Sequence, residues 1–88
     1  MAVANRIHVI RIDVAYAGEF IVIPHTNKKS ALLDFYDRIK WWEDNLKVTS
    51  KKLSETNTEI EVDVRDPISE EGASLYFNTV ESGEELVL

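Results

Sequence analysis

The chain has 88 residues, of which 44% are hydrophobic and 30% charged, with no cysteine and a formal net charge of −6. This composition indicates one globular domain over residues 1–88, and it excludes disulfide bridges and thiolate metal sites. No apolar run reaches the ~20 residues that span a bilayer, and the first residues lack the apolar segment of a signal peptide. We therefore expect a cytoplasmic protein that does not contact membranes.

The charges are divided unevenly along the sequence. Residues 1–54 carry nine basic and six acidic side chains, whereas residues 55–88 carry one basic and ten acidic side chains. Such asymmetry concerns binding partners rather than the fold. It argues against direct nucleic-acid binding by the acidic part, because phosphates would be repelled.

The first predicted strand covers residues 6–16, which are rich in β-branched residues. Its apolar alternation changes phase, because Ile7 and Val9 share one face whereas Ile10 and Ile12 share the other. The change indicates either a bulge near Val9 and Ile10 or a strand that is covered on both faces.

A second strand is predicted over residues 19–23, after a short turn. The proline that follows it, Pro24, has no N–H to donate and is expected to end the strand.

A helix is predicted over about residues 28–53. Thr26 or Asn27 is its candidate N-cap, and Ser30 is a later one. Apolar residues then recur at steps of 3, 4, 3, 4 and 7, which is a single stripe at the helical period. The stripe consists of Leu32, Phe35, Ile39, Trp42, Leu46 and Leu53. Residues 48–50 are expected to loosen the last turns, because β-branched residues and serine favour helices less.

Two further strands are predicted over residues 58–65 and 73–80. The first has the clearest alternation, with Ile60, Val62 and Val64 facing the core. In the second, Leu75 and Phe77 share one face. The order of elements predicts an α+β fold of ββαββ type, with a four-stranded, mainly antiparallel sheet and one long amphipathic helix packed on one face.

One helix covers one face of a sheet, so the other face is expected to be exposed and apolar. The residues predicted to lie there are Ile7, Val9, Ile21 and Ile23. A contiguous apolar patch marks an interface, and a two-fold homodimer is its simplest cover. The alternative cover is the end of the chain, residues 86–88.

The helix offers a candidate surface for another protein. Trp41 lies about 130° from the centre of the apolar stripe and is therefore expected to be exposed. The other residues assigned to this surface are Leu33, Tyr36, Asp37 and Asp44. In the alternative, the helix rotates so that both Trp41 and Trp42 pack at the sheet margin.

An acidic row provides a third surface. Glu59, Glu61 and Asp63 alternate along one face of a predicted strand, about 7 Å apart. The row is either an ordinary solvated face or a mimic of nucleic-acid phosphates that occupies the basic groove of a nucleic-acid-binding protein.

Signals of catalysis are few. His25 precedes Lys28, Lys29 and Ser30 at the predicted helix start, where backbone N–H groups could hold an anion. His8 alternates with the apolar positions on the same side as Arg6 and is expected to be an exposed strand residue. Neither His8 nor His25 stands in a recognised nucleophile motif, and the carboxylates lack metal-loop spacing. We therefore predict no enzyme activity, no catalytic residue, no cofactor and no metal.

The leading hypothesis is a small, non-catalytic protein-interaction module, homodimeric, that binds a macromolecular partner. A first alternative is an acidic inhibitor or nucleic-acid mimic of the kind used by mobile elements and phages. A second is a small-anion binder or enzyme that uses the helix N-terminus near His25.

Overall fold

The computed structural model describes residues 6–18 and 20–81. Within these ranges the chain forms five strands and one helix: β1 (Arg6–Val14), β2 (Phe20–His25), α1 (Lys28–Leu46), β3 (Lys51–Glu55), β4 (Glu59–Arg65) and β5 (Gly72–Glu81). The predicted α+β class and antiparallel sheet are confirmed, and the predicted number of four strands was wrong.

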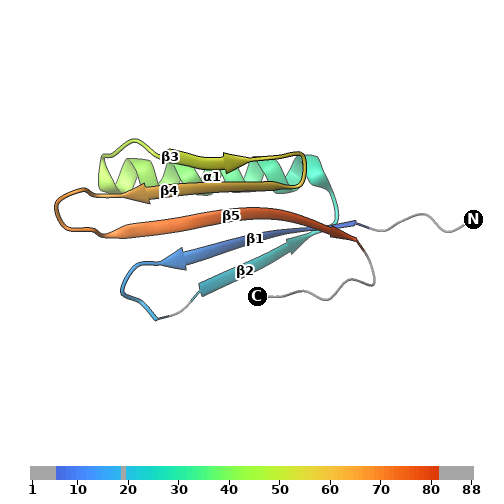
Figure 1. The fold of residues 1–88 in the computed structure, drawn as a ribbon, viewed down its shortest axis with the longest axis horizontal. Coiled ribbons are helices and arrows are strands. Elements are labelled where there is room, and N and C mark those ends of the chain that lie inside the picture. Colours follow the sequence, from blue (N-terminus) through green and yellow to red (C-terminus); the bar gives the residue numbers. More distant parts are fainter. Residues whose placement is uncertain (1–5, 19, 82–88) are drawn as a thin grey trace, which may run out of the picture.

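The five described strands form one sheet in the order β2-β1-β5-β4-β3, and every neighbouring pair is antiparallel. Helix α1 lies against one face of this sheet, behind it in Figure 1, and contacts β1, β2, β4 and β5. In the described part of the chain no element covers the opposite face. We call that face the open face.

The core lies between α1 and the sheet. Helix α1 contributes Ala31, Phe35 and Ile39, all buried. The sheet contributes Ile10, Ile12, Ile60, Val62, Val64, Ala73, Leu75 and Phe77. The alternation predicted for β4 and β5 is thus confirmed, because Ile60, Val62 and Val64 of β4 and Leu75 and Phe77 of β5 enter this core.

Helix α1 begins at Lys28, as predicted, and its N-cap is Asn27, one of the candidates. The side-chain Oδ1 of Asn27 accepts a hydrogen bond from the N–H of Ser30 at 3.0 Å. The helix ends at Leu46, seven residues before the predicted end. Lys47 adopts a left-handed conformation with φ of 55° and donates its N–H to the carbonyl of Glu43. Residues 48–50, which favour helices little, therefore terminate the helix instead of loosening it.

Strand β3 occupies the segment that was predicted as the end of the helix. All five of its residues are exposed, including Leu53, which is 49% exposed and lies outside the core stripe. The segment forms a strand because it pairs with β4 through a short turn, in which the Oγ1 of Thr56 accepts from the N–H of Glu59. Its pairing shifts register between Lys52 and Ser54.

Strand β1 is continuous and contains no bulge, so that alternative was wrong. Residues 6–14 pair without a shift with β5, and residues 8–13 pair likewise with β2.

Val9 is only 6% exposed although it lies on the open face. It is covered because β1 is a central strand, with Pro24 and Asn78 as its cross-strand neighbours. The strand ends at Val14 rather than at residue 16, and Tyr16 has a positive φ of 64° in the turn that follows.

Strand β2 passes through Pro24 and ends at His25, so the expectation that Pro24 ends the strand was wrong. A proline is tolerated because β2 is an edge strand, where the position of the missing N–H can face away from the neighbouring strand. At the opposite edge, β3 carries Lys51 and Lys52 together with the register shift. Proline, lysine and irregular pairing all discourage edge-to-edge association of sheets.

Candidate functional site: a groove between the helix and an edge strand

A groove of 440 Å³ runs between α1 and strands β1 and β2. Its apolar lining comes from Ile12 and Ile21 of the sheet and Trp41 and Trp42 of the helix. Its polar lining consists of Asp34, Asp37 and Arg38. Grooves with mostly apolar walls and a few polar groups are the usual form of binding sites in proteins.

The register of the sheet places the floor of the groove. Ile12 pairs with Ile21, and both side chains therefore point toward α1. Ile12 is 2% exposed, whereas Ile21 is 48% exposed because it lies on the edge strand, beyond the cover of the helix. The groove thus exists because one helix is too narrow to cover the sheet as far as β2.

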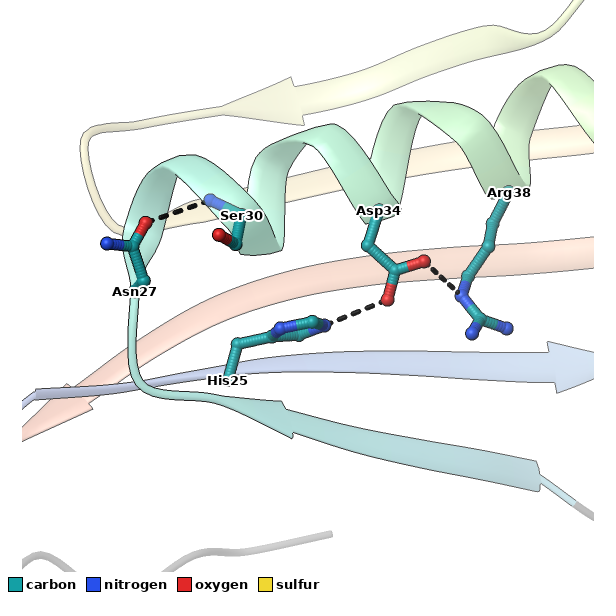
Figure 2. Close-up of polar contacts among 5 residues, drawn as sticks. All are labelled: His25, Asn27, Ser30, Asp34 and Arg38. Carbon is teal, nitrogen blue, oxygen red and sulfur yellow. Dashed lines mark hydrogen bonds and ion pairs between the residues drawn. The ribbon is translucent and has the colours of Figure 1, made fainter.

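Asp34 connects the helix to β2 through hydrogen bonds. The ring Nε2–H of His25 donates to its Oδ2 at 2.8 Å, and the Nε–H of Arg38 donates to its Oδ1 at 2.8 Å (Figure 2). Burial by itself raises the pKa of Asp34, but these two hydrogen bonds outweigh it and the pKa lies below its ordinary value. The carboxylate is therefore ionised near neutral pH and holds β2 against α1 beside the groove.

Trp41 is the exposed aromatic residue of the groove. It is 57% exposed, as its position on the helix predicted, and its ring meets that of Trp42 edge-on at 5.1 Å between centroids. Trp42 is partly buried and packs against the core. Trp41 thus lies at the sheet margin beside Trp42 and Ile21, as the alternative held, but it remains more than half exposed. An exposed tryptophan fixed against a packed neighbour is a common anchor of protein interfaces.

The other residues predicted to share this surface are not all beside Trp41. Asp37 lines the groove. Tyr36 stands five residues before Trp41, about 140° away around the helix, and it does not line the groove. Leu33 is 60% exposed and does not line the groove. Asp44 is exposed one turn after Trp41.

The four residues predicted for a dimer interface do not share one face, and this grouping was wrong. Ile7 and Val9 lie on the open face. Ile21 and Ile23 pair with Ile12 and Ile10, so they lie on the side of the helix, where Ile23 packs against the core. The error arose because residues 20–23 are all apolar, and such a run does not reveal which alternate residues face inward.

The open face nevertheless carries an apolar patch on β2, β1 and β5. The register places on it Ile7, Val9, Phe20, Val22, Pro24, Tyr76 and Val80. The guanidinium of Arg11 lies 4.9 Å from the ring centroid of Phe20 and 5.7 Å from that of Tyr76. Arg11 also donates to Asp13 at 3.0 Å. We call these seven residues the open-face patch. The end of the chain, the alternative cover, lies outside the described residues.

The acidic row lies on the same face, on β4. Glu59, Glu61 and Asp63 project from it as predicted, with Glu59 exposed. Asp63 accepts hydrogen bonds from Ser74 at 3.1 Å and from Arg65 at 3.5 Å. One of the three charges is therefore compensated, and the row gives only weak support to the hypothesis of a phosphate mimic.

Several polar groups near the helix N-terminus already have partners, and Figure 2 shows the contact of Ser30 with Asn27 and that of His25 with Asp34. The N–H of Ser30 is bonded to Asn27, and the Nζ of Lys28 donates to the carbonyl of Asn57 at 3.2 Å. His25 is engaged by Asp34, and among the described residues it makes no hydrogen bond to the hydroxyl of Ser30. Lys29 is exposed. The arrangement gives little support to an anion site or a nucleophile activated by His25.

The other histidine, His8, is 5% exposed on the helix side of the sheet. Its Nδ1 shares a hydrogen bond of 2.8 Å with Oγ1 of Thr79, and its ring stacks on Phe77. The expectation that it is an exposed strand residue was wrong, because its register partner His25 also faces α1. Burial lowers the pKa of His8, and the positive charges of Lys28, Arg6 and His25 lower it further.

This lowered pKa predicts a loss of stability in mild acid. The unfolded chain binds a proton on His8 near its ordinary pKa of 6.5, whereas the folded protein resists protonation. The contribution of neutral His8 to the free energy of unfolding is therefore complete above pH 6.5. It is lost as the pH falls from there toward the lower pKa of His8 in the folded protein. We expect urea titrations between about pH 7.5 and 5 to show this decline, and to show a smaller one in His8→Gln. Equal declines in both proteins would contradict the prediction.

No group of three or more histidine, cysteine or carboxylate side chains among the described residues is arranged to hold a metal ion. In the same part of the chain, no helix combines the length and the apolar character that a membrane crossing requires.

The comparisons with known proteins found no relative. No family model matches the chain, no curated protein matches it, and no solved structure matches it.

Proposed function

We propose that the chain is a small, non-catalytic protein-interaction module of the cytoplasm that binds a partner protein in the groove between α1 and β2. The observation that carries this proposal is the exposed indole of Trp41 on an apolar groove of 440 Å³. The absence of cysteine supports a reducing compartment. The engagement of His25 by Asp34 supports a structural role for that histidine.

The groove supplies what a peptide-binding surface needs. Ile12 and Trp42 are held by the core, so the floor is formed before a partner binds. Ile21 and Trp41 are about half exposed and would lose that exposure to a bound side chain. Because Trp41 projects from a helix anchored at Phe35 and Ile39, its position is fixed by packing rather than by a loop.

The test is a selection of random peptides displayed on phage, carried out in parallel on the wild-type protein and on Trp41→Ala. We expect peptides that bind the wild type and that lose most of their binding to Trp41→Ala, because a central aromatic anchor dominates such interfaces. The matched control is Leu33→Ala, which removes an exposed apolar side chain of α1 outside the groove. It should bind the selected peptides like the wild type. A selection that yields no peptide dependent on Trp41 would contradict the proposal.

Homodimerisation through the open-face patch is a second part of the proposal. Three strands about 4.8 Å apart and about 25 Å long give roughly 350 Å² per copy, or roughly 700 Å² in total, which is below the ~1,000 Å² that a stable interface buries. Both sheet edges discourage edge pairing, so packing of open face on open face is the arrangement that remains for a second copy. A two-fold axis parallel to β1 and close to it would place the acidic β4 strands on opposite sides of the dimer.

We therefore expect weak, concentration-dependent dimerisation, with a Kd of roughly 10–500 μM. Sedimentation equilibrium over a range of concentrations measures it. Val22→Glu places a charge in the open-face patch and should give a monomer at every concentration. Leu33→Glu makes the same kind of change on the exposed side of α1 and should leave dimerisation unaltered. A wild-type protein that stays monomeric throughout would contradict the dimer.

A further inference from the structure

The charges around Trp41 indicate the chemistry of the partner. Asp37 lies four residues before Trp41 and Asp44 three residues after it, so the two carboxylates flank the indole on adjacent turns of α1. Both are exposed, and among the described residues neither forms an ion pair. The third carboxylate of this side, Asp34, is by contrast compensated by Arg38. Within about one helical turn of Trp41 there are therefore two exposed carboxylates that form no ion pair among the described residues, and one of them, Asp37, lines the groove.

We propose that the segment bound in the groove is cationic, with an arginine or lysine next to an apolar side chain; this inference rests on the proposed function. The cation lies over the exposed face of Trp41 and reaches the carboxylates of Asp37 and Asp44. Its apolar neighbour enters the groove between Ile21 and Trp42. A guanidinium suits this site best, because it stacks on an indole through its face and donates to carboxylates through its edge.

The same charges select against other ligands. An acidic peptide would be repelled by Asp37 and Asp44, and its approach would be opposed by the net charge of −6. A purely apolar peptide would fill the floor of the groove but would bury the carboxylates without a partner, which is unfavourable. We therefore expect the carboxylates of Asp37 and Asp44 to raise the affinity for a basic peptide and to lower it for an apolar one.

The experiment uses the peptides obtained in the selection described above. We expect an excess of arginine and lysine, adjacent to apolar residues, among those that depend on Trp41. The most enriched peptide is then labelled with fluorescein and its Kd is measured by fluorescence polarisation. For the double variant Asp37→Asn, Asp44→Asn we expect a Kd about 3- to 10-fold higher than for the wild type. Raising the salt concentration should weaken wild-type binding more than binding by this variant.

The matched control is the double variant Glu59→Gln, Glu71→Gln. It removes the same number of exposed carboxylates from positions outside the groove, and so it changes the net charge equally. Its Kd should stay within about twofold of the wild-type value. An equal loss in both double variants would mean that only the net charge matters and would overturn the inference.

Two further outcomes are separable. In the first, the selected peptides depend on Trp41 but show no excess of basic residues, or they bind the Asp37→Asn, Asp44→Asn variant like the wild type. This result would overturn the cationic partner and leave the proposed function intact. If no selected peptide depends on Trp41, the groove is not a binding site, and the proposed function and the inference both fail.

Discussion

Gly72→Ala is expected to destabilise the protein by about 3–5 kcal/mol, which is a large part of the roughly 4–13 kcal/mol that a chain of this size has available. Gly72 is buried at the start of β5 and has a φ of 152°, a conformation that residues with a side chain rarely adopt. A Cβ there would overlap the carbonyl oxygen of Val64 and lie 2.8 Å from the Cα of Arg65. Both obstacles are backbone atoms of β4, so they cannot move without disturbing the strand pairing.

The consequence extends to both neighbours of β5. Gly72 pairs with Arg65 of β4, and its carbonyl accepts from the N–H of Ala15, which directly follows β1, at 2.9 Å. A shift of Gly72 would therefore disturb the central strands on which α1 packs.

Gly18→Ala is the matched control for this prediction. Gly18 also has a positive φ, of 67°, but among the described residues no atom outside its own chain neighbours lies within 4 Å of the position of its Cβ. Its substitution should cost only the backbone strain of about 1–2 kcal/mol. Urea titrations followed by circular dichroism measure both variants. Equal losses for the two glycines would show that the contact with Val64 is unimportant.

The elements that the sequence predicted well are those in which a periodic pattern coincides with burial. In β4, Ile60, Val62 and Val64 alternate with charged residues, and only one of the two faces can be the inner one. The stripe of α1 likewise identifies Phe35 and Ile39 as core residues. In both cases only one type of secondary structure, with one of its faces turned inward, buries the apolar side chains.

Strand β3 could not be predicted in this way. Its sequence, Lys-Lys-Leu-Ser-Glu, has no apolar alternation, and all its side chains are exposed. It is a strand because β4 offers it a pairing edge, and that edge exists only in the folded sheet. A sequence pattern reports burial, so a strand that buries no side chain gives no such signal.

The groove was predicted only in part, for a related reason. The position of Trp41 on the helix follows from the apolar stripe, and Asp37 follows from its proximity to Trp41. The opposite wall depends on the pairing of Ile21 with Ile12, and the apolar run of residues 20–23 leaves that face undetermined. Two further lining residues, Asp34 and Arg38, have the i, i+4 spacing of a helical ion pair, which was the one available signal for them.

The second large effect is expected at the centre of the core. Phe35→Ala should lower the free energy of unfolding by about 3–5 kcal/mol, because it removes a fully buried ring and leaves a cavity. The ring centroids of Phe35 and Phe77 are 5.9 Å apart, so Phe35 connects α1 to the central strand β5. Its loss also frees the helix that carries Trp41, and peptide binding in the groove should weaken with it wherever the variant is still folded.

The neighbouring residue provides the control, because Tyr36 is aromatic and helical like Phe35 but 45% exposed. Its ring touches that of Phe35 edge-on, with centroids 5.5 Å apart, and Tyr36→Ala should therefore cost only about 1 kcal/mol. Urea titrations of the two variants, followed by tryptophan fluorescence, measure the difference. The contrast between them tests the orientation of α1 on the sheet. Were Tyr36→Ala the more damaging change, the helix would face the sheet with another side, and the groove walls assigned to Trp41 and Asp37 would be misplaced.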